Sequence, residues 1–546
     1  MENRRRHGGN LSTQDTAGQF LMDVIMNKMG QSKLSRRARK ILKFSSSIGI
    51  GGSCHLLTSA LKMITRPHKP THASNPEVLL ISPPVFATDQ PPLGIAYLKA
   101  YLAKKGIKAR CIDFNMQLYK ILKNNKSYPF HSVHNIFTDP SSFERFKGEL
   151  FGRIMDEWVD EILRINPKFL GISMTSPLTY FPIDYIVNSI RSSNPKIKII
   201  LGGPCCMIDG AKLIEKGYGD IAIRGEGENA FFCAVEALKK NTSMEGISGL
   251  IHISNGKTIT NQGVDHVKDL DDLPFPDFDD FSINDYRGNL VFAKLPMAGS
   301  RGCVANCDFC NINLLWEKFR RRSAENIFLE MKRNKDKYGV FIFNFNDSLM
   351  NANPSDLEEL CDLIIGSKEA FLWSGDYRIW EQPAPKKLFG KMVKAGCVLI
   401  NIGVESGSEK VRKEMGKPFT DKTLREHIVA MHQAGLAARL MFIIGHPAET
   451  KEDFEKTLGF VEEYRKYLSM VSFGFTCKIN PGTPLWEKRA KYGISYDEEG
   501  EWYAGANTMR VRMQRLDYAN EIGTKLGIIH KHGIVHTGNA RKTIYS

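Results

Sequence analysis

The chain has 546 residues, of which 42% are hydrophobic and 25% are charged, and its formal net charge is +15. This composition is typical of a globular protein, and the length is enough for about three domains. Residues 1–75 hold 13 Lys plus Arg against 3 Asp plus Glu, so they carry +10 and the other 471 residues carry +5. The basic charge therefore describes one segment, which argues against nucleic acid as the partner of the folded part.

Residues 1–75 are predicted to form a basic extension with apolar residues at helical spacing between Phe20 and Met29. It is either a segment that touches an anionic membrane surface or a partner, or a solvated tail. No apolar run approaches the roughly 20 residues of a membrane span, and no secretory signal is legible. Scattered cysteines favour reduced thiols, so we expect a cytoplasmic, anoxic setting with peripheral membrane contact through the extension as an alternative.

Residues 76–265 alternate between apolar strands and helices. The pattern predicts strands at 77–82, 107–113, 169–174, 197–202 and 220–224, helices at 93–105, 151–165, 183–192, 208–216 and 226–239, and an irregular insertion at 120–142. Continuously apolar strands separated by helices indicate a parallel sheet that is covered on both faces. We therefore predict a doubly wound, Rossmann-like domain with a ligand groove at the carboxyl ends of its strands.

Residues 266–290 are predicted to be a linker, because two prolines lie two residues apart in the stretch 273–280. Residues 291–485 then repeat strand and helix units, with strands predicted at 291–297, 341–346, 371–376, 398–404, 439–444 and 471–479. About six units are too few for a closed eight-stranded barrel, so we predict a partial (β/α)6 barrel with its chemistry at the carboxyl ends of the strands. Residues 486–546 are predicted to be a helical region that covers the barrel mouth.

Three cysteines, Cys303, Cys307 and Cys310, form a C-x3-C-x2-C motif directly after the first barrel strand. Three thiolates this close together are placed to bind one soft metal centre. A structural zinc site would need a fourth Cys or His at short spacing, and His266 and Cys361 are distant. The motif therefore favours a [4Fe-4S] cluster in which one iron stays open for a small molecule.

This spacing, with Phe309 before the last cysteine, resembles the radical S-adenosylmethionine (SAM) superfamily. The resemblance implies that the fourth iron binds the methionine part of SAM, and that an electron from the cluster cleaves SAM to a 5′-deoxyadenosyl radical. It also implies roles for polar residues at the strand ends. Asp347 is expected near the methionine amino group, Glu405 and Ser406 near the carboxylate or ribose, Arg439 at the carboxylate, and Gly445 beside the adenine.

The turns of the first domain resemble those of the cobalamin-binding domain that precedes many radical SAM enzymes. Cobalamin-binding proteins that coordinate cobalt through a histidine carry a D-x-H-x-x-G turn, whereas this chain has Asp89, Pro91 and Gly94 at that spacing. Proline cannot ligate cobalt, so we predict base-off cobalamin without a histidine ligand. The other residues that the resemblance assigns to cobalamin are Ser173, Thr175, Gly202, Gly203, Gly225 and Glu226.

Together these features resemble the class B radical SAM methyltransferases. They imply methylation of an unactivated carbon in a lipid, a peptide or a small natural product, with flavodoxin or ferredoxin as the electron donor. Ring formation, oxidation or rearrangement with the same cofactors is the first alternative. An RNA methylthiotransferase ranks lower, because the leading domain lacks that family's three cysteines, and a non-enzymatic cobalamin or metal sensor is the remaining one.

Overall fold

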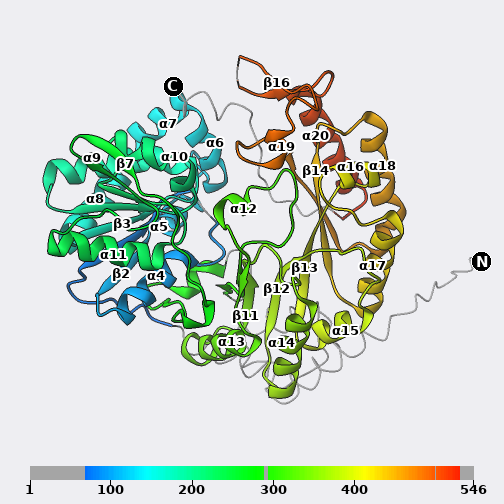
Figure 1. Ribbon diagram of the computed structural model, residues 1–546, viewed down its shortest axis with the longest axis horizontal. Helices are drawn as coiled ribbons and strands as arrows, with labels where there is room; N and C mark the ends of the chain where they lie inside the picture. The colour runs from blue at the N-terminus through cyan, green and yellow to red at the C-terminus, as the bar shows by residue number, and fades with distance from the viewer. Residues whose placement is uncertain (1–67, 86, 288–292, 499, 529–546) are drawn as a thin grey trace, which may run out of the picture.

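The computed structural model describes residues 68–85, 87–287, 293–498 and 500–528 (Figure 1). Residues 1–67 lie outside these ranges, and with them most of the predicted basic extension. Within the described residues, no helix is both long and apolar enough to cross a membrane.

The first sheet has seven strands in the order β2-β1-β3-β4-β5-β6-β7. Their bounds are β1 Val78–Ser82, β2 Ala109–Asp113, β3 Phe169–Ser173, β4 Lys198–Gly202, β5 Ile221–Ile223, β6 Leu250–Ser254 and β7 Lys257–Thr260. Strands β1 to β5 pair in parallel, which confirms the predicted doubly wound sheet. The antiparallel pair β6-β7 was not predicted, because the strand–helix alternation ends before it.

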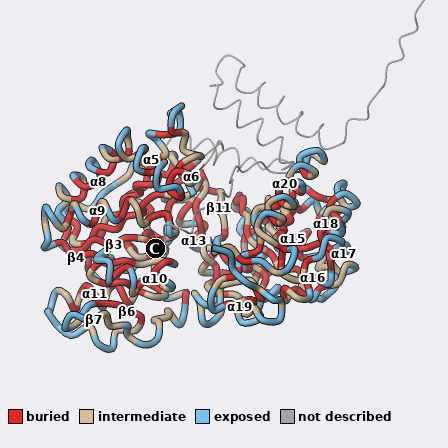
Figure 2. Tube along the Cα trace, turned by 90° about the horizontal axis from the view of Figure 1, so that it is seen from above, coloured by how far each residue is buried: buried red, intermediate tan, exposed pale blue. Residues whose placement is uncertain are grey.

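Helices cover both faces of this sheet, so its strands are buried on each side, as all five residues of β1 show. The helices are α4 Leu93–Lys104, α5 Phe114–Leu122, α6 Val133–Thr138, α7 Pro140–Phe146, α8 Gly152–Ile165, α9 Tyr180–Ser193, α10 Pro204–Glu215 and α11 Gly227–Lys240. Helices α4 and α11 contact each other, and α8 contacts α9. Figure 2 shows the buried strands enclosed by more exposed helices.

The insertion predicted to be irregular at residues 120–142 is instead mostly helical. Its aromatic side chains, with neighbours on either side, form a buried cluster that includes Phe114, Phe137, Phe143, Phe146 and Phe151. The polar residues that suggested irregular structure end and begin short helices, as when the Asp139 side chain accepts a hydrogen bond from the Ser142 amide at 2.9 Å. Burial of the aromatic residues therefore decides the structure here.

The predicted linker packs tightly between the two sheets. Phe278 is fully buried, and Asp280 accepts a hydrogen bond from the Cys111 amide at 2.8 Å and pairs with Lys99 at 2.7 Å. The Tyr286 hydroxyl donates to Asp113 at 2.8 Å. These contacts join the α4 side of the first sheet and the second sheet into one continuous hydrophobic core.

The second sheet confirms the partial barrel, with six parallel strands in the order β15-β14-β13-β12-β11-β8. The strands are β8 Leu295–Met297, β11 Ile342–Phe345, β12 Leu372–Tyr377, β13 Cys397–Glu405, β14 Ala438–Ile444 and β15 Met470–Thr476. The helices are α12 Ile312–Leu315, α13 Ala324–Tyr338, α14 Pro354–Ser367, α15 Lys386–Lys394, α16 Glu409–Glu414, α17 Asp421–Ala434 and α18 Lys451–Tyr464. Alternate residues of β14 are buried, so one side of the strand faces the helices and the other faces the lumen.

The carboxyl-terminal region departs from the prediction. It contains α19 Pro484–Glu487, α20 Met509–Lys525 and an antiparallel hairpin of β16 Ser495–Tyr496 and β17 Trp502–Tyr503, which was not predicted. Helix α20 packs against β15 and α18 at the side of the barrel, where Figure 1 shows it. The helix therefore covers the last strand; residues 529–546 lie outside the described residues, and the predicted cover over the barrel mouth stays a prediction.

Candidate active site

The three cysteines lie in a loop that a small β-hairpin holds at its base. Strand β9 Ser300–Arg301 pairs with β10 Arg320–Arg321, and the loop between them carries Cys303, Cys307 and Cys310. Gly302 has a φ of +87°, and a Cβ there would lie 2.8 Å from the Lys318 carbonyl oxygen, so the turn into the loop requires glycine.

The loop is anchored through the backbone of Asp308, which lies between the second and third cysteines. The Asp308 amide donates to the Met415 carbonyl at 3.1 Å, and the Asp308 carbonyl accepts from the Leu485 amide at 2.8 Å. All three thiols are half-buried, and burial raises the pKa of Cys310. Phe309 packs with the apolar group around Leu485.

The three thiols are a donor set that is compatible with an iron–sulfur cluster. Among the described residues, no three His, Cys, Asp or Glu side chains converge as ligands of one ion would. A cubane cluster does not require that convergence, because each thiolate binds a different iron. Three half-buried thiols on one short loop are compatible with such a cluster.

Asp347 follows β11 and holds the segment that leads to this loop. Its buried carboxylate accepts hydrogen bonds from the Gly299 amide at 2.9 Å and from the Ser300 hydroxyl. Burial raises the pKa of Asp347 to about 6. The structure thus assigns these carboxylate oxygens to the protein backbone and Ser300, and the predicted contact with the SAM amino group stays a prediction.

Glu405 and Ser406 are adjacent in sequence but make contacts in different places. The Glu405 carboxylate pairs with Lys417 at 2.6 Å, and its backbone has a φ of 67°. The Ser406 hydroxyl accepts from the Ser408 amide at 3.1 Å and lies 3.4 Å from the Thr457 hydroxyl. Ser406 therefore belongs to the packing between this turn and α18.

Arg439 lies in the lumen near polar residues of the neighbouring strands. Asn401, its register partner on β13, donates to Asp376 on β12 at 2.9 Å, and the Asn401 Oδ1 atom is buried without a partner. Burial lowers the pKa of Arg439, whose Nε lies 3.1 Å from the sulfur of Met470. The lumen therefore holds an amide oxygen of Asn401, the guanidinium of Arg439 and the carboxylate of Asp376, and these groups can bind a zwitterionic ligand.

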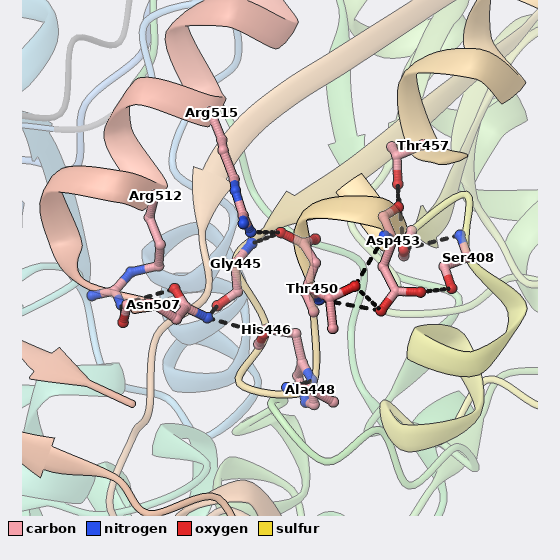
Figure 3. Close-up of polar contacts among 12 residues, drawn as sticks. Ser408, Gly445, His446, Ala448, Thr450, Asp453, Thr457, Asn507, Arg512 and Arg515 are labelled. Carbon is pink, nitrogen blue, oxygen red and sulfur yellow. Dashed lines mark hydrogen bonds and ion pairs between the residues drawn. The ribbon is translucent and has the colours of Figure 1, made fainter. Parts of the chain in front are cut away.

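Gly445 begins the turn after β14, where the adenine is expected (Figure 3). Its amide donates to Glu449 at 3.0 Å, and its φ is +82°. Burial raises the pKa of Glu449 to about 7, although its ion pair with Arg515 at 3.0 Å opposes this. A Cβ at position 445 would lie 2.4 Å from the Arg512 side chain, so this close approach requires glycine.

The carboxyl-terminal segment, in which the sequence shows no motif, braces this turn. Asn507 donates to the carbonyls of Gly445 and His446, each at 3.2 Å, and Arg512 holds the Asn507 carbonyl at 3.0 Å. Figure 3 shows Arg512 and Arg515 reaching the turn from one helix, α20. The sequence shows only two arginines three residues apart, and this pattern does not indicate a contact with the turn after β14.

A second network, also in Figure 3, fixes the 405–408 turn to α18. Thr450 and Asp453 form a capping box at the start of this helix, and the Ser408 hydroxyl donates to Asp453 at 2.7 Å. The pKa of Asp453 is about 2, because hydrogen bonds from Lys410 and Ser408 outweigh its burial. The turns after β13 and β14 are thereby held to the same helix.

The residues assigned to cobalamin all lie at or after the carboxyl ends of β1, β3, β4 and β5, so they share one edge of the first sheet. This edge contains the point where the chain reverses between β1 and β3, at which doubly wound folds bind ligands. A Cβ at Gly94 or Gly202 would meet no atom within 4 Å, whereas Gly203, with a φ of +97°, would contact the Met174 carbonyl oxygen at 2.8 Å. The Thr175 hydroxyl is buried and has no hydrogen-bond partner in the part of the chain that the structure describes. Open space over glycines and an unpaired hydroxyl fit a large polar ligand.

This edge also contacts the barrel at two points. The Asn344 amide, on β11, lies 3.4 Å from the Gln90 side-chain oxygen, and Asp89 pairs with Lys294 at 2.6 Å. Pro91, which lies between Gln90 and α4 in the sequence, is buried. The first turn of the candidate cobalamin edge therefore lies against the start of the barrel.

The second contact is a buried ion-pair cluster that we call the interdomain clamp: Glu226, Glu228, Arg301 and Arg320. Arg301 pairs with Glu226 at 2.6 Å and with Glu228, and Arg320 pairs with Glu226. Both arginines outweigh the effect of burial and lower the pKa of Glu226. Gly225, with a φ of +86°, makes the turn that presents Glu226, whose carboxylate is thus committed to the clamp.

Two family models match the chain over the parts just described. The model of the B12-binding domain matches residues 84–233, and that of the radical SAM superfamily matches residues 297–461, which include the three cysteines. The chain contains a B12-binding domain and a radical SAM domain.

Two relatives are similar to the chain over more than half of its length. An uncharacterized methyltransferase of Pyrococcus horikoshii is 27% identical over 75% of this chain and 82% of the relative. An anaerobic magnesium-protoporphyrin IX monomethyl ester cyclase of Cereibacter sphaeroides is 21% identical over 61% of this chain and 55% of the relative.

Among solved structures, the cobalamin-dependent radical enzyme OxsB, with aqua-cobalamin and SAM bound, has a TM-score of 0.63 and 17% identity. The match covers 82% of this chain and 66% of OxsB. This likeness supports the fold.

Proposed function

We propose that this radical SAM enzyme transfers a methyl group from SAM, through cobalamin, to an unactivated carbon. When bound, the cluster supplies an electron that cleaves SAM, and cobalamin supplies the methyl group. Both must reach one substrate, and the observation that carries the proposal is the interdomain clamp, which ties the candidate cobalamin turn to Arg301, two residues before Cys303.

Methyl transfer is preferred to cyclisation because the methyltransferase relative aligns over more of this chain than the cyclase does, 75% against 61%. We infer base-off cobalamin without a histidine from the first turn, because Pro91 has no side-chain donor for cobalt. The proposed roles of Asp89, Gly94, Ser173, Thr175, Gly202, Gly203 and Gly225 are to line the cofactor.

The proposed substrate is a lipid, a peptide or a small natural product, and flavodoxin or ferredoxin is the proposed reductant. The polar groups Asp376, Asn401 and Arg439 leave the barrel lumen able to bind the amino acid part of SAM, and the substrate would lie between the lumen and the cobalamin edge. The basic extension is proposed as the part that would touch an anionic membrane.

The test uses anaerobically reconstituted protein with dithionite, SAM and hydroxocobalamin, with 5′-deoxyadenosine and S-adenosylhomocysteine measured by mass spectrometry. We expect retained cobalamin and both products. Deoxyadenosine alone would contradict methyl transfer and favour cyclisation, oxidation or rearrangement. A Cys303→Ala variant is the matched control and should yield no deoxyadenosine. Vesicle binding before and after deletion of residues 1–67 separately tests the membrane proposal.

A further inference from the structure

Arg378 follows β12 and reaches the cysteine loop from across the barrel. Its Nη1 lies 3.2 Å from Cys307 Sγ, and its Nη2 donates to the Gly416 carbonyl at 2.9 Å. Gly416 belongs to the turn that packs on the loop, because a Cβ there would lie 2.8 Å from the Asn306 carbonyl oxygen. One guanidinium therefore contacts a cysteine sulfur and the turn behind it.

The position of Arg378 is fixed from its backbone outward. The fully buried side chain of Asn351 accepts from the Arg378 amide at 2.9 Å and donates to its carbonyl at 2.8 Å. The guanidinium carbon lies 5.0 Å from the centre of the Trp380 ring, which covers one face of the group. These contacts aim the side chain at the sulfur without help from a ligand.

Among the described residues, no carboxylate forms an ion pair with Arg378. Within the described residues, its polar contacts are the Cys307 sulfur and the Gly416 carbonyl, and its Nε is buried without a partner. Arg301 and Arg322, by contrast, pair with carboxylates, Arg301 with Glu226 and Arg322 with Glu330. The Arg378 guanidinium is half-buried and has no carboxylate partner among the described residues, and thiolates bound to iron would supply negative charge beside it.

We propose that Arg378 raises the reduction potential of the iron–sulfur cluster and so makes it easier to reduce. Reduction adds one electron to the cluster and no bond changes at Arg378, so a fixed positive charge and an N–H···S hydrogen bond stabilise the more negative state. Charge and hydrogen bonds to sulfur are the main protein contributions to such potentials. The proposal rests on the cluster and is independent of whether a methyl group is transferred.

The test is a redox titration of the full-length reconstituted protein without SAM, followed by electron paramagnetic resonance of the reduced cluster. In Arg378→Gln, we expect the ratio of reduced to oxidised cluster at a fixed solution potential to fall about tenfold, which is 59 mV for one electron. Arg378→Lys keeps the charge, so its ratio should stay within about threefold of the wild-type ratio.

Arg425→Gln is the matched control, because Arg425 also stacks on an aromatic ring, that of Tyr464, but lies on the surface with Glu463 as its partner. This control should titrate like the wild type. Arg378→Gln protein that holds full iron and sulfide but titrates at the wild-type potential would overturn the proposal. If this variant loses its cluster, Arg378→Lys decides, and a tenfold fall in that variant would also overturn it.

Discussion

Replacing Arg301 with Met tests whether the interdomain clamp holds the two parts of the molecule together. The Arg301 side chain is 11% exposed, and those of Glu226 and Glu228 are 2% and 7% exposed. Among the described residues, Arg301→Met would leave Glu228 without an arginine and Glu226 with Arg320 and His266. Removing one partner of a buried ion pair costs about 3–5 kcal/mol, because the remaining charge stays buried. We therefore expect a loss of this size in the free energy of unfolding.

Urea denaturation of the protein without cofactors measures this loss, and limited proteolysis shows whether the two parts separate. The matched control is Arg425→Met, because the Arg425–Glu463 pair is 46% and 56% exposed and such pairs contribute about 0–1 kcal/mol. Adding Glu228→Gln to Arg301→Met removes the stranded charge and should restore about 1–2 kcal/mol. A loss no larger than that of the control would refute the argument.

Three further predictions concern single residues. Gly202→Val should change the free energy of unfolding by no more than about 0.5 kcal/mol, since a Cβ at this position meets open space. The variant should retain at least tenfold less cobalamin, as measured by cobalt content. Full retention would show that Gly202 is not part of the cobalamin site. Gly445→Ala should weaken equilibrium binding of SAM about tenfold, because the new Cβ clashes with Arg512 and the positive φ costs about 1–2 kcal/mol for alanine. Gly435→Ala is the control: its φ is also positive, +75°, but its Cβ meets open space, so SAM binding should not weaken. Because the pKa of Glu449 is raised to about 7, the folded state binds more protons than the unfolded state between pH 4.5 and 7, and the contribution of Glu449 to stability falls as pH rises through this window. The stability of Glu449→Gln relative to the wild type should therefore increase from pH 5 to 7. A stability difference that stays constant with pH in urea titrations would contradict this.

The strands of both sheets could be predicted because burial and periodicity are local properties of the sequence. The strand at 398–404, for example, is observed as Cys397–Glu405. The cysteine loop was equally legible, since the chemistry of three thiols depends on their spacing. Both sheets confirm the predicted α/β architecture, a doubly wound domain followed by a partial barrel.

The remaining features depend on contacts that sequence spacing does not encode. Glu226 was assigned to cobalamin from its turn, yet its carboxylate pairs with arginines about 75 and 94 residues further along the chain. The helices of the insertion were not predicted because its polar residues interrupt the apolar pattern, although its aromatic residues form a buried cluster. The role of α20 could not be predicted because its arginines contact the turn after β14, which is distant in the sequence. Packing between distant segments decided each of these cases.

Magnetic coupling between the two cofactors tests most directly whether they face one shared space. The measurement is an electron paramagnetic resonance spectrum of the reconstituted protein in which the cluster is reduced and cobalamin is in its paramagnetic Co(II) state. We predict that the two signals broaden or split one another, and that Arg301→Met weakens this interaction. A spectrum equal to the sum of the two separate signals would contradict the proposed arrangement.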